Sequence, residues 1–292
     1  MTTGITIYKG LSKEDVETYG LVLLSCGIVH QAVRMETGWE LRVDSARADE
    51  AETLIRKYQH ENPAVHPEPE TMFHDFKKSL AGVWGALLLL AVHVYIYTRA
   101  DVYLLKNTYA ATAGRILNGD WYRAATALLL HANAMHLAGN MIGIAVLGSA
   151  VCSIMGWGVG WLMILSSGIA GNLLNAIAYK AGHSSIGAST AVFGALGILS
   201  AWQFLRRVRQ PGQRFKALLP LGAGLALLGF MGSSMHADIM AHLFGFLVGM
   251  IMGGLYGTAL KQRPDFRVQA AALGVVILIL VRAWMSGNIK PG

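Results

Sequence analysis

The stretch AHLFGFLVGMIMGGLYG, residues 241–257, decides how this chain can fold. It is almost wholly apolar, and glycine recurs at every fourth residue, at Gly245, Gly249, Gly253 and Gly257. Residues four apart lie on one face of an α-helix, so this helix presents a face without side chains. Small residues at this spacing allow two helix backbones to approach closely inside a membrane. The stretch therefore predicts a membrane-spanning helix that packs tightly against a neighbour.

The composition of the whole chain is that of a membrane protein. Of its 292 residues, 54% are hydrophobic and 14% are charged, and the mean hydropathy is +0.44. Residues 1–80 carry 9 Lys/Arg and 13 Asp/Glu, whereas residues 81–292 carry 15 and 4. The two parts therefore suit different solvents. The basic loops between apolar segments fit a lipid surface, and we predict no nucleic-acid partner.

Residues 1–62 have the pattern of a small α+β domain with the element order β-α-β-β-α. Ser12 stands as an N-cap before acidic residues, residues 36–38 predict a turn, and residues 45–62 predict an amphipathic helix. The chain starts without the charged and apolar regions of a signal peptide, so we expect this domain to be cytosolic. Nothing in it has catalytic spacing, which favours a regulatory, tethering or oligomerising role.

A linker and seven apolar segments follow this domain. Residues 63–79 are rich in proline, which predicts the linker. Each apolar segment approaches the length of about 20 residues that spans a bilayer. The segments are residues 80–98, 134–153, 157–178, 186–204, 216–234, 238–258 and 266–285.

The positions of the basic residues predict an orientation for these spans. Basic residues precede the first span and lie in the loops that join spans four to five and six to seven. The positive-inside rule places these loops in the cytosol, so spans two, four and six begin at the outer face. Residues 99–133 are amphipathic and dotted with Trp and Tyr, which suits a segment lying in the membrane interface. The fold class is an all-α polytopic membrane protein preceded by a small α+β soluble domain.

Four polar side chains occur early in the three spans that begin at the outer face. His136 and Asn140 belong to span two, Ser189 to span four and His242 to span six. Each lies within about two helical turns of the outer end of its span. Polar residues inside a membrane are costly and are functional candidates by default. The topology therefore brings these four side chains to a common depth.

The residue types at this depth point to acyl-transfer chemistry. A serine beside a histidine is a nucleophile and its base, and Asn and His side chains can donate to a developing oxyanion. His131 lies five residues before His136, about 140° round the helix, so the two are poor joint metal ligands. The two cysteines, Cys26 and Cys152, lie in different domains. We predict neither a metal site nor a cofactor.

Four motifs in order carry a resemblance to a known family. They are GDWYR (119–123), HANAMHLAGN (131–140), GASTAVFG (187–194) and ADIMAHLFGFLVG (237–249). Together they resemble the rhomboid family of intramembrane serine proteases. The resemblance covers residues 80–260 as a six-span catalytic core. It leaves residues 261–292 as a seventh span with a short tail.

The resemblance implies a role for each candidate residue. Ser189 is the nucleophile and His242 the general base of a dyad, while His136 and Asn140 donate to the oxyanion together with the backbone N–H of Ser189. Asp238, one turn before His242, is interpreted as a helix cap. Thr190 departs from the glycine that many members have after the nucleophile. The residues expected to support the site are His131, Phe193, Gly187, Gly245, Gly249 and Arg123.

The implied function is hydrolysis of peptide bonds in or next to transmembrane segments of other membrane proteins. The implied setting is the inner membrane of a bacterium, with the active site open to the outer face. Three alternatives stay open: a catalytically silent relative that binds membrane helices, a polytopic transporter, and a passive anchor for the N-terminal domain. The absence of acidic residues inside the spans argues against the transporter. The sequence predicts no particular oligomeric state.

Overall fold

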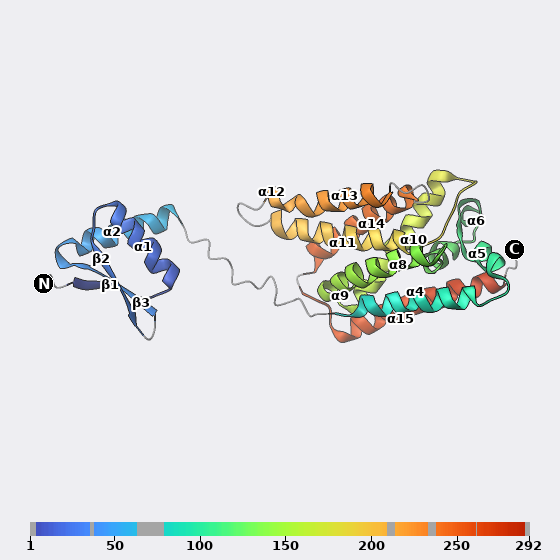
Figure 1. Cartoon of the computed structure of the whole chain (residues 1–292), viewed down its shortest axis with the longest axis horizontal. Coiled ribbons are helices and arrows are strands. Elements are labelled where there is room, and N and C mark those ends of the chain that lie inside the picture. The colour runs from blue at the N-terminus through green and yellow to red at the C-terminus, as the bar shows by residue number, and fades with distance from the viewer. Residues whose placement is uncertain are drawn as a thin grey trace. The chain divides into compact units, whose positions relative to one another are not determined.

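The computed structural model describes residues 4–35, 38–62, 79–208, 214–232, 238–260 and 262–289. The chain divides into two compact units, residues 1–72 and 73–292 (Figure 1). Parts of three predicted features lie outside the described residues. They are the first two residues of the turn at 36–38, all but the last residue of the linker at 63–79, and the final three residues of the C-terminal tail.

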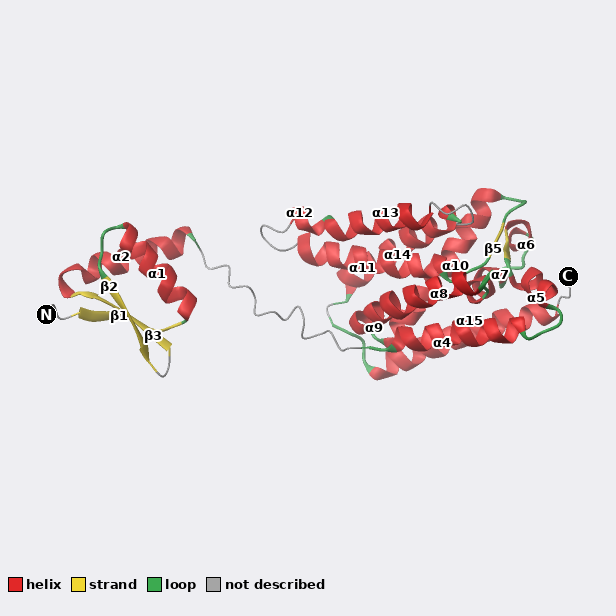
Figure 2. Cartoon of the chain, in the orientation of Figure 1, coloured by secondary structure: helices red, strands yellow, loops and turns green. Residues whose placement is uncertain are grey.

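The N-terminal unit has the predicted element order, which is confirmed. A three-stranded antiparallel sheet with β3 in the centre packs with two helices (Figure 2). The Ser12 hydroxyl caps the first helix by accepting from the Asp15 N–H at 3.0 Å. Leu23, Leu41 and Ile55 are fully buried in the core. The elements are β1 (Gly4–Leu11), α1 (Lys13–Ser25), β2 (His30–Met35), β3 (Gly38–Asp44), the 3₁₀ turn η1 (Ser45–Arg47) and α2 (Ala48–Glu61).

The segment at residues 99–133, which we expect to lie in the membrane interface and call the interfacial segment, contains no helix long enough to cross a bilayer. Its longest helix has 8 residues, about 12 Å at 1.5 Å per residue, against a hydrocarbon core of about 30 Å. The short strand in this segment pairs with β5 (Ser184–Ser185), just before the fourth apolar helix. The elements of the segment are α5 (Val102–Tyr109), β4 (Ala111–Thr112), α6 (Ala113–Leu117), α7 (Arg123–Thr126) and η2 (Ala127–Leu129).

Helices occupy all seven predicted apolar segments, which gives the fold of a multi-pass membrane protein. Among the described residues, four helices are long and apolar enough to span a bilayer: 134–155, 157–179, 239–259 and 266–287. The first and fifth helices are shorter, and the fourth carries Arg206 and Arg207 in its last turn. The helices are α4 (Ala81–Tyr97), α8 (Ala134–Gly143) running through the π-helical turn η3 (Ile144–Gly148) into α9 (Ser149–Met155), α10 (Trp157–Tyr179), α11 (Ser189–Val208), α12 (Arg214–Ala217), α13 (Leu219–Gly232), α14 (Ile239–Ala259) and α15 (Phe266–Ile289).

The glycine face of α14 packs directly on the backbone of α11, which confirms the predicted close approach (Figure 1). A methyl group placed on Gly245, Gly249 or Gly253 would overlap a backbone carbonyl oxygen of α11. At Gly257 the nearest atoms belong instead to side chains, at 3.3 Å or more. The two helices therefore touch backbone to backbone over three glycines and separate toward the end of α14.

The seventh helix is hydrogen-bonded into the core near its N-terminal end. The buried Gln269 side chain of α15 accepts from the backbone N–H groups of Gly158 at 2.8 Å and Val159 at 3.0 Å. These N–H groups begin α10 and have no partner within their own helix. Near the other end of α15, Trp284 stacks on Tyr109 with 4.2 Å between ring centroids. The helix is thus joined both to α10 and to the interfacial segment.

Two alanine substitutions on α14 distinguish the effect of helix packing on stability from the effect of helix propensity. We expect Gly249→Ala to destabilise the protein because the methyl group overlaps the Gly194 carbonyl, whereas Gly254→Ala meets nothing within 4 Å. Overpacking costs about 1–3 kcal/mol, and both variants share the gain of about 1 kcal/mol that alanine brings to a helix. Thermal unfolding in detergent should place the stability of Gly249→Ala about 1–3 kcal/mol below that of Gly254→Ala. Equal stabilities would contradict the packing described above.

Candidate active site

Ser189 and His242 form a hydrogen-bonded pair where α11 and α14 begin. Ser189 is the first residue of α11, and His242 lies in the first turn of α14. The Ser189 Oγ and the His242 Nε2 are 2.7 Å apart. The Phe193 ring, one turn along α11, stacks on the imidazole with 4.6 Å between centroids and 24° between planes. The His242 imidazole is therefore held by a hydrogen bond at Nε2 and by the Phe193 ring against one face.

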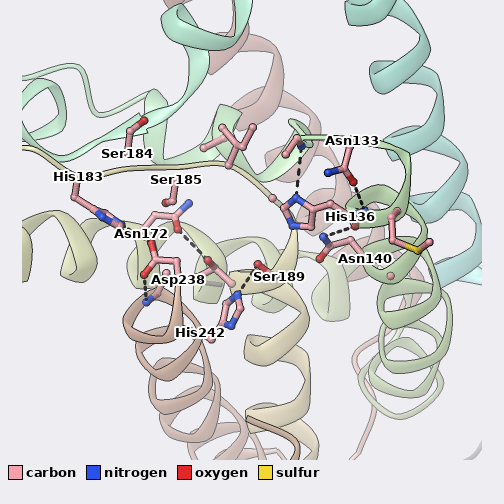
Figure 3. Close-up of a pocket in the computed structure, with 18 residues that line it drawn as sticks. Asn133, His136, Asn140, Asn172, His183, Ser184, Ser185, Ser189, Asp238 and His242 are labelled. Atoms are coloured by element: carbon pink, nitrogen blue, oxygen red, sulfur yellow. Dashed lines mark hydrogen bonds and ion pairs between the residues drawn. The ribbon is translucent and has the colours of Figure 1, made fainter. Parts of the chain in front are cut away.

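Asp238 is the N-cap of α14 and not a third member of this pair. Its Oδ1 accepts from the Ala241 N–H at 3.1 Å, and its Oδ2 accepts from the Asn175 amide at 2.7 Å. The same Oδ2 lies 2.6 Å from the His183 Nε2 (Figure 3). Among the described residues, the Nδ1 atom of His242 has no hydrogen-bond partner. The carboxylate thus faces α10 and the loop before β5, and the serine and histidine stand as a dyad.

His136 lies beside Ser189, whereas the Asn140 side chain is bonded within its own helix. The His136 Nδ1 accepts from the Ala132 N–H at 3.5 Å, which places the ring proton on Nε2. A methyl group on Gly187 would lie 2.8 Å from that Nε2 and 3.5 Å from the Ser189 Oγ. The Asn140 amide donates to the His136 carbonyl at 2.9 Å. The space above Gly187 is therefore bounded by the serine hydroxyl and an N–H donor.

Gly187 and His131 hold the loop that leads into α11. Gly187 has φ +139°, a conformation that favours glycine, and its N–H donates to the Ala127 carbonyl at 2.9 Å. The buried His131 Nε2 accepts from the Ala188 N–H at 3.5 Å. Burial is the main cause that lowers the pKa of His131, to about 3, so the ring is neutral at neutral pH and can accept.

Arg123 braces the interfacial segment away from the dyad. The side chain is buried, and its Nη1 donates to the backbone carbonyls of Asn107 at 2.7 Å and Ala110 at 3.3 Å. Its Nε donates to Asp120 at 3.3 Å. Arg123 does not line the cavity that contains Ser189. Its contacts are therefore those of a structural residue.

The dyad opens into a cavity of about 720 Å³. Figure 3 shows polar side chains from several elements around it. Within the described part of the chain, no three His, Cys, Asp or Glu side chains gather closely enough to hold a metal ion. The polar residues that line the cavity include Ser189, His242, His136, Asn140, Asn172, Thr190, His183 and Asp238.

Three polar residues near the dyad are absent from the candidates that the sequence suggested. Asn172 and Asn175 are buried in the C-terminal third of the apolar helix α10, and His183 lies in the loop after it. Polar residues within an apolar span are functional candidates, and this rule applied to span three would have found both asparagines. No pattern in the sequence distinguishes His183.

Comparison with known proteins identifies the family. A family profile described as Rhomboid domain matches residues 118–259. YdcA of Bacillus subtilis (strain 168), a rhomboid relative, is 30% identical over 155 residues, which cover 53% of this chain and 77% of YdcA. The chain belongs to the rhomboid family.

Two further relatives show the range of activities within the family. The rhomboid protease GluP, also of Bacillus subtilis, is 30% identical over 172 residues, which cover 57% of this chain and 30% of GluP. Inactive rhomboid protein 2 of Homo sapiens is 29% identical over 138 residues, which cover 46% of this chain and 15% of the human protein. The chain spans less than a third of the length of either relative.

The bond between His183 and Asp238 predicts a measurable effect on the loop before α11. We expect His183→Ala to speed amide hydrogen exchange in residues 180–188 by about tenfold, because hydrogen bonds to charged groups contribute about 1.5–3 kcal/mol. Exchange followed by mass spectrometry measures this. Ser185→Ala, in the same loop, is the matched control. Wild-type exchange rates in His183→Ala would contradict a tie through Asp238.

Proposed function

We propose that this protein is an intramembrane serine protease that cleaves peptide bonds in or next to transmembrane segments of other membrane proteins. The observation that carries the proposal is the 2.7 Å bond between the Ser189 Oγ and the His242 Nε2, inside a cavity. The helices that bear the pair belong to a multi-pass membrane fold of the rhomboid family. The substrate is therefore expected to reach the pair from the bilayer.

The dyad can carry both halves of a hydrolysis. In the first half, His242 Nε2 takes the proton from the Ser189 Oγ as that oxygen bonds the substrate carbonyl carbon. The protonated ring then gives this proton to the leaving amide nitrogen, and the C–N bond breaks to leave an acyl ester on Ser189. In the second half, His242 takes a proton from water, whose oxygen attacks the ester. The serine recovers its proton from the ring as the acid leaves.

The negative charge on the tetrahedral intermediate requires donors on one side of Ser189. The Nε2–H of His136 borders the space above Gly187, and the backbone N–H of Ser189 lies at the start of α11. Preorganised donors of this kind stabilise an oxyanion. The Asn140 amide joins them only after it releases the His136 carbonyl, so we assign it a secondary role.

Charge along α11 supports an active site near the outer face. Ser189 begins this helix, and Arg206 and Arg207 lie at its other end, roughly 25 Å away at about 1.5 Å per residue. The positive-inside rule assigns the arginines to the cytosolic side, so the nucleophile lies toward the outside of a bacterial inner membrane. We further propose residues 1–62 as a cytosolic domain, 63–79 as its linker, 80–260 as the catalytic core and 261–292 as a seventh span with a tail.

The substrate must change conformation before it can react. A transmembrane helix satisfies its backbone carbonyls internally, so the cleaved bond has to leave the helix before Ser189 reaches it. Segments that unwind easily, with small residues or helix breakers near the cleaved bond, are therefore the expected substrates.

A catalytically silent protein that binds membrane helices is the second candidate. It is favoured by the similarity to a human relative named as inactive. Such a protein would keep the fold and the cavity but would not react at its serine. Reactivity of Ser189 therefore separates the two functions.

Cleavage of a single-span test substrate in detergent measures the proposed activity. We expect Ser189→Ala and His242→Ala to lower the cleavage rate at least about a thousandfold, because nucleophile and base act as one unit. A fluorophosphonate probe should label the wild type and not Ser189→Ala.

Ser200→Ala is the matched control for the serine substitution. Ser200 is buried on the same helix and bonds the Pro220 carbonyl at 3.1 Å, away from the cavity. It should keep wild-type cleavage and labelling. Full activity in Ser189→Ala or in His242→Ala would remove the dyad from the mechanism, and an unlabelled, inactive wild type would favour the silent protein.

A further inference from the structure

Thr190, the residue after the proposed nucleophile, is bonded to a side chain of another helix. Its Oγ1 donates to the Asn172 Oδ1 at 3.0 Å, and the Asn172 amide donates to the Ala124 carbonyl at 2.8 Å. Both side chains are buried, with exposed fractions of 4% for Thr190 and 3% for Asn172. This chain of two bonds joins α11 to α10, and α10 to α7 of the interfacial segment. Figure 3 shows the Asn172 bond next to Ser189.

Glycines on two neighbouring helices make room for the threonine. A methyl group on Gly171 of α10 would lie 2.6 Å from the Thr190 Cγ2. A methyl group on Gly245 of α14 would overlap the Thr190 carbonyl oxygen and lie 3.0 Å from the Cγ2. A β-branched side chain on a helix has few χ1 rotamers, so contacts on this side and the bond to Asn172 on the other hold it in one of them. The bulk of the threonine side chain is thus matched by space in the facing helices.

The position of Thr190 connects this bond to the chemistry. Thr190 shares the first turn of α11 with Ser189, so its anchor holds the backbone that carries the nucleophile and one N–H donor. Reacting groups must stay within about 0.5 Å of their productive geometry, and displacements of about 1 Å can cost a hundredfold in rate. In the membrane interior, moreover, a hydroxyl without a partner is costly, which favours a single geometry for the bond.

We propose that Thr190 and Asn172 form a positioning pair that sets the Ser189 hydroxyl against His242 and links its placement to the interfacial segment through Ala124. The inference rests on the proposed protease function and names two further residues that serve the same site. Neither residue is assigned a proton transfer or a contact with the scissile bond. Their effect is to hold the start of α11 in the geometry that the reaction requires.

The test uses the full-length protein in detergent with a cleavable single-span substrate. The variants are Thr190→Val, which keeps the shape and removes the hydroxyl, Thr190→Ser, which keeps the hydroxyl, Asn172→Leu, and the double variant Thr190→Val/Asn172→Leu. We expect Thr190→Val to lower kcat about tenfold with KM unchanged, and Thr190→Ser to remain close to wild type. The double variant should be no slower than the slower single variant, because residues that act as a pair are not additive.

Thr258→Val is the control on α14, where the exposed Thr258 hydroxyl bonds two carbonyls of its own helix, at 3.1 Å and 3.0 Å. It should leave kcat unchanged. The proposed positioning pair would be overturned if folded Thr190→Val kept a wild-type kcat. It would also be overturned if this variant changed only its melting temperature or only its KM. If Asn172→Leu fails to fold, the comparison of Thr190→Val with Thr190→Ser decides the outcome. A wild type that neither cleaves nor accepts a fluorophosphonate would overturn the protease function as well, so the two failures are distinguishable.

Discussion

The direct contact between the backbones of α11 and α14 is the constraint on which the site depends. Glycines on α14 allow carbonyl oxygens of α11 to approach to a distance that no side chain would permit. Only at that separation can a short serine side chain on one helix reach a histidine on the other. Packing in a membrane lacks the hydrophobic driving force of water, so close van der Waals contact between small residues is what holds such helices together. The same contact therefore contributes stability and brings Ser189 within hydrogen-bonding distance of His242.

Polar groups in this unit form bonds between segments that are distant in sequence. Asp238 caps α14 while it also bonds Asn175 of α10 and His183 of the loop before α11. Gln269 joins the seventh helix to the start of α10 in the same manner. In a bilayer a buried polar group without a partner costs several kcal/mol, so each of these bonds restricts the arrangement of the helices. Backbone contact fixes how far apart the helices lie, and the polar bonds fix how they are aligned along their length.

Much of the fold could be predicted because the period of the apolar residues and the spacing of the glycines can be seen within a single segment of the sequence. The seven apolar segments, the order of the N-terminal elements and the glycine face of α14 all follow from such local patterns, and the structure confirms them. The hydrogen-bond partners of individual side chains could not be predicted. Spacing places Asn140 on the same face as His136, but the helix geometry directs its amide to the His136 carbonyl. The partner of Thr190 depends on which residue of α10 lies opposite, and no pattern within either segment contains that information.

The rate at which a fluorophosphonate reacts with Ser189 in Gly245→Ala tests the central claim most directly. A methyl group at this position overlaps the Thr190 carbonyl and separates α11 from α14 one turn from His242. The account predicts that the folded variant, compared with Gly254→Ala, reacts at least about tenfold more slowly. Relieving the overlap of the methyl group with the Thr190 carbonyl oxygen separates the helices by about 1 Å, which takes Ser189 out of hydrogen-bonding distance of His242. An unchanged reaction rate in folded Gly245→Ala would contradict the claim that backbone contact between these helices brings the dyad together.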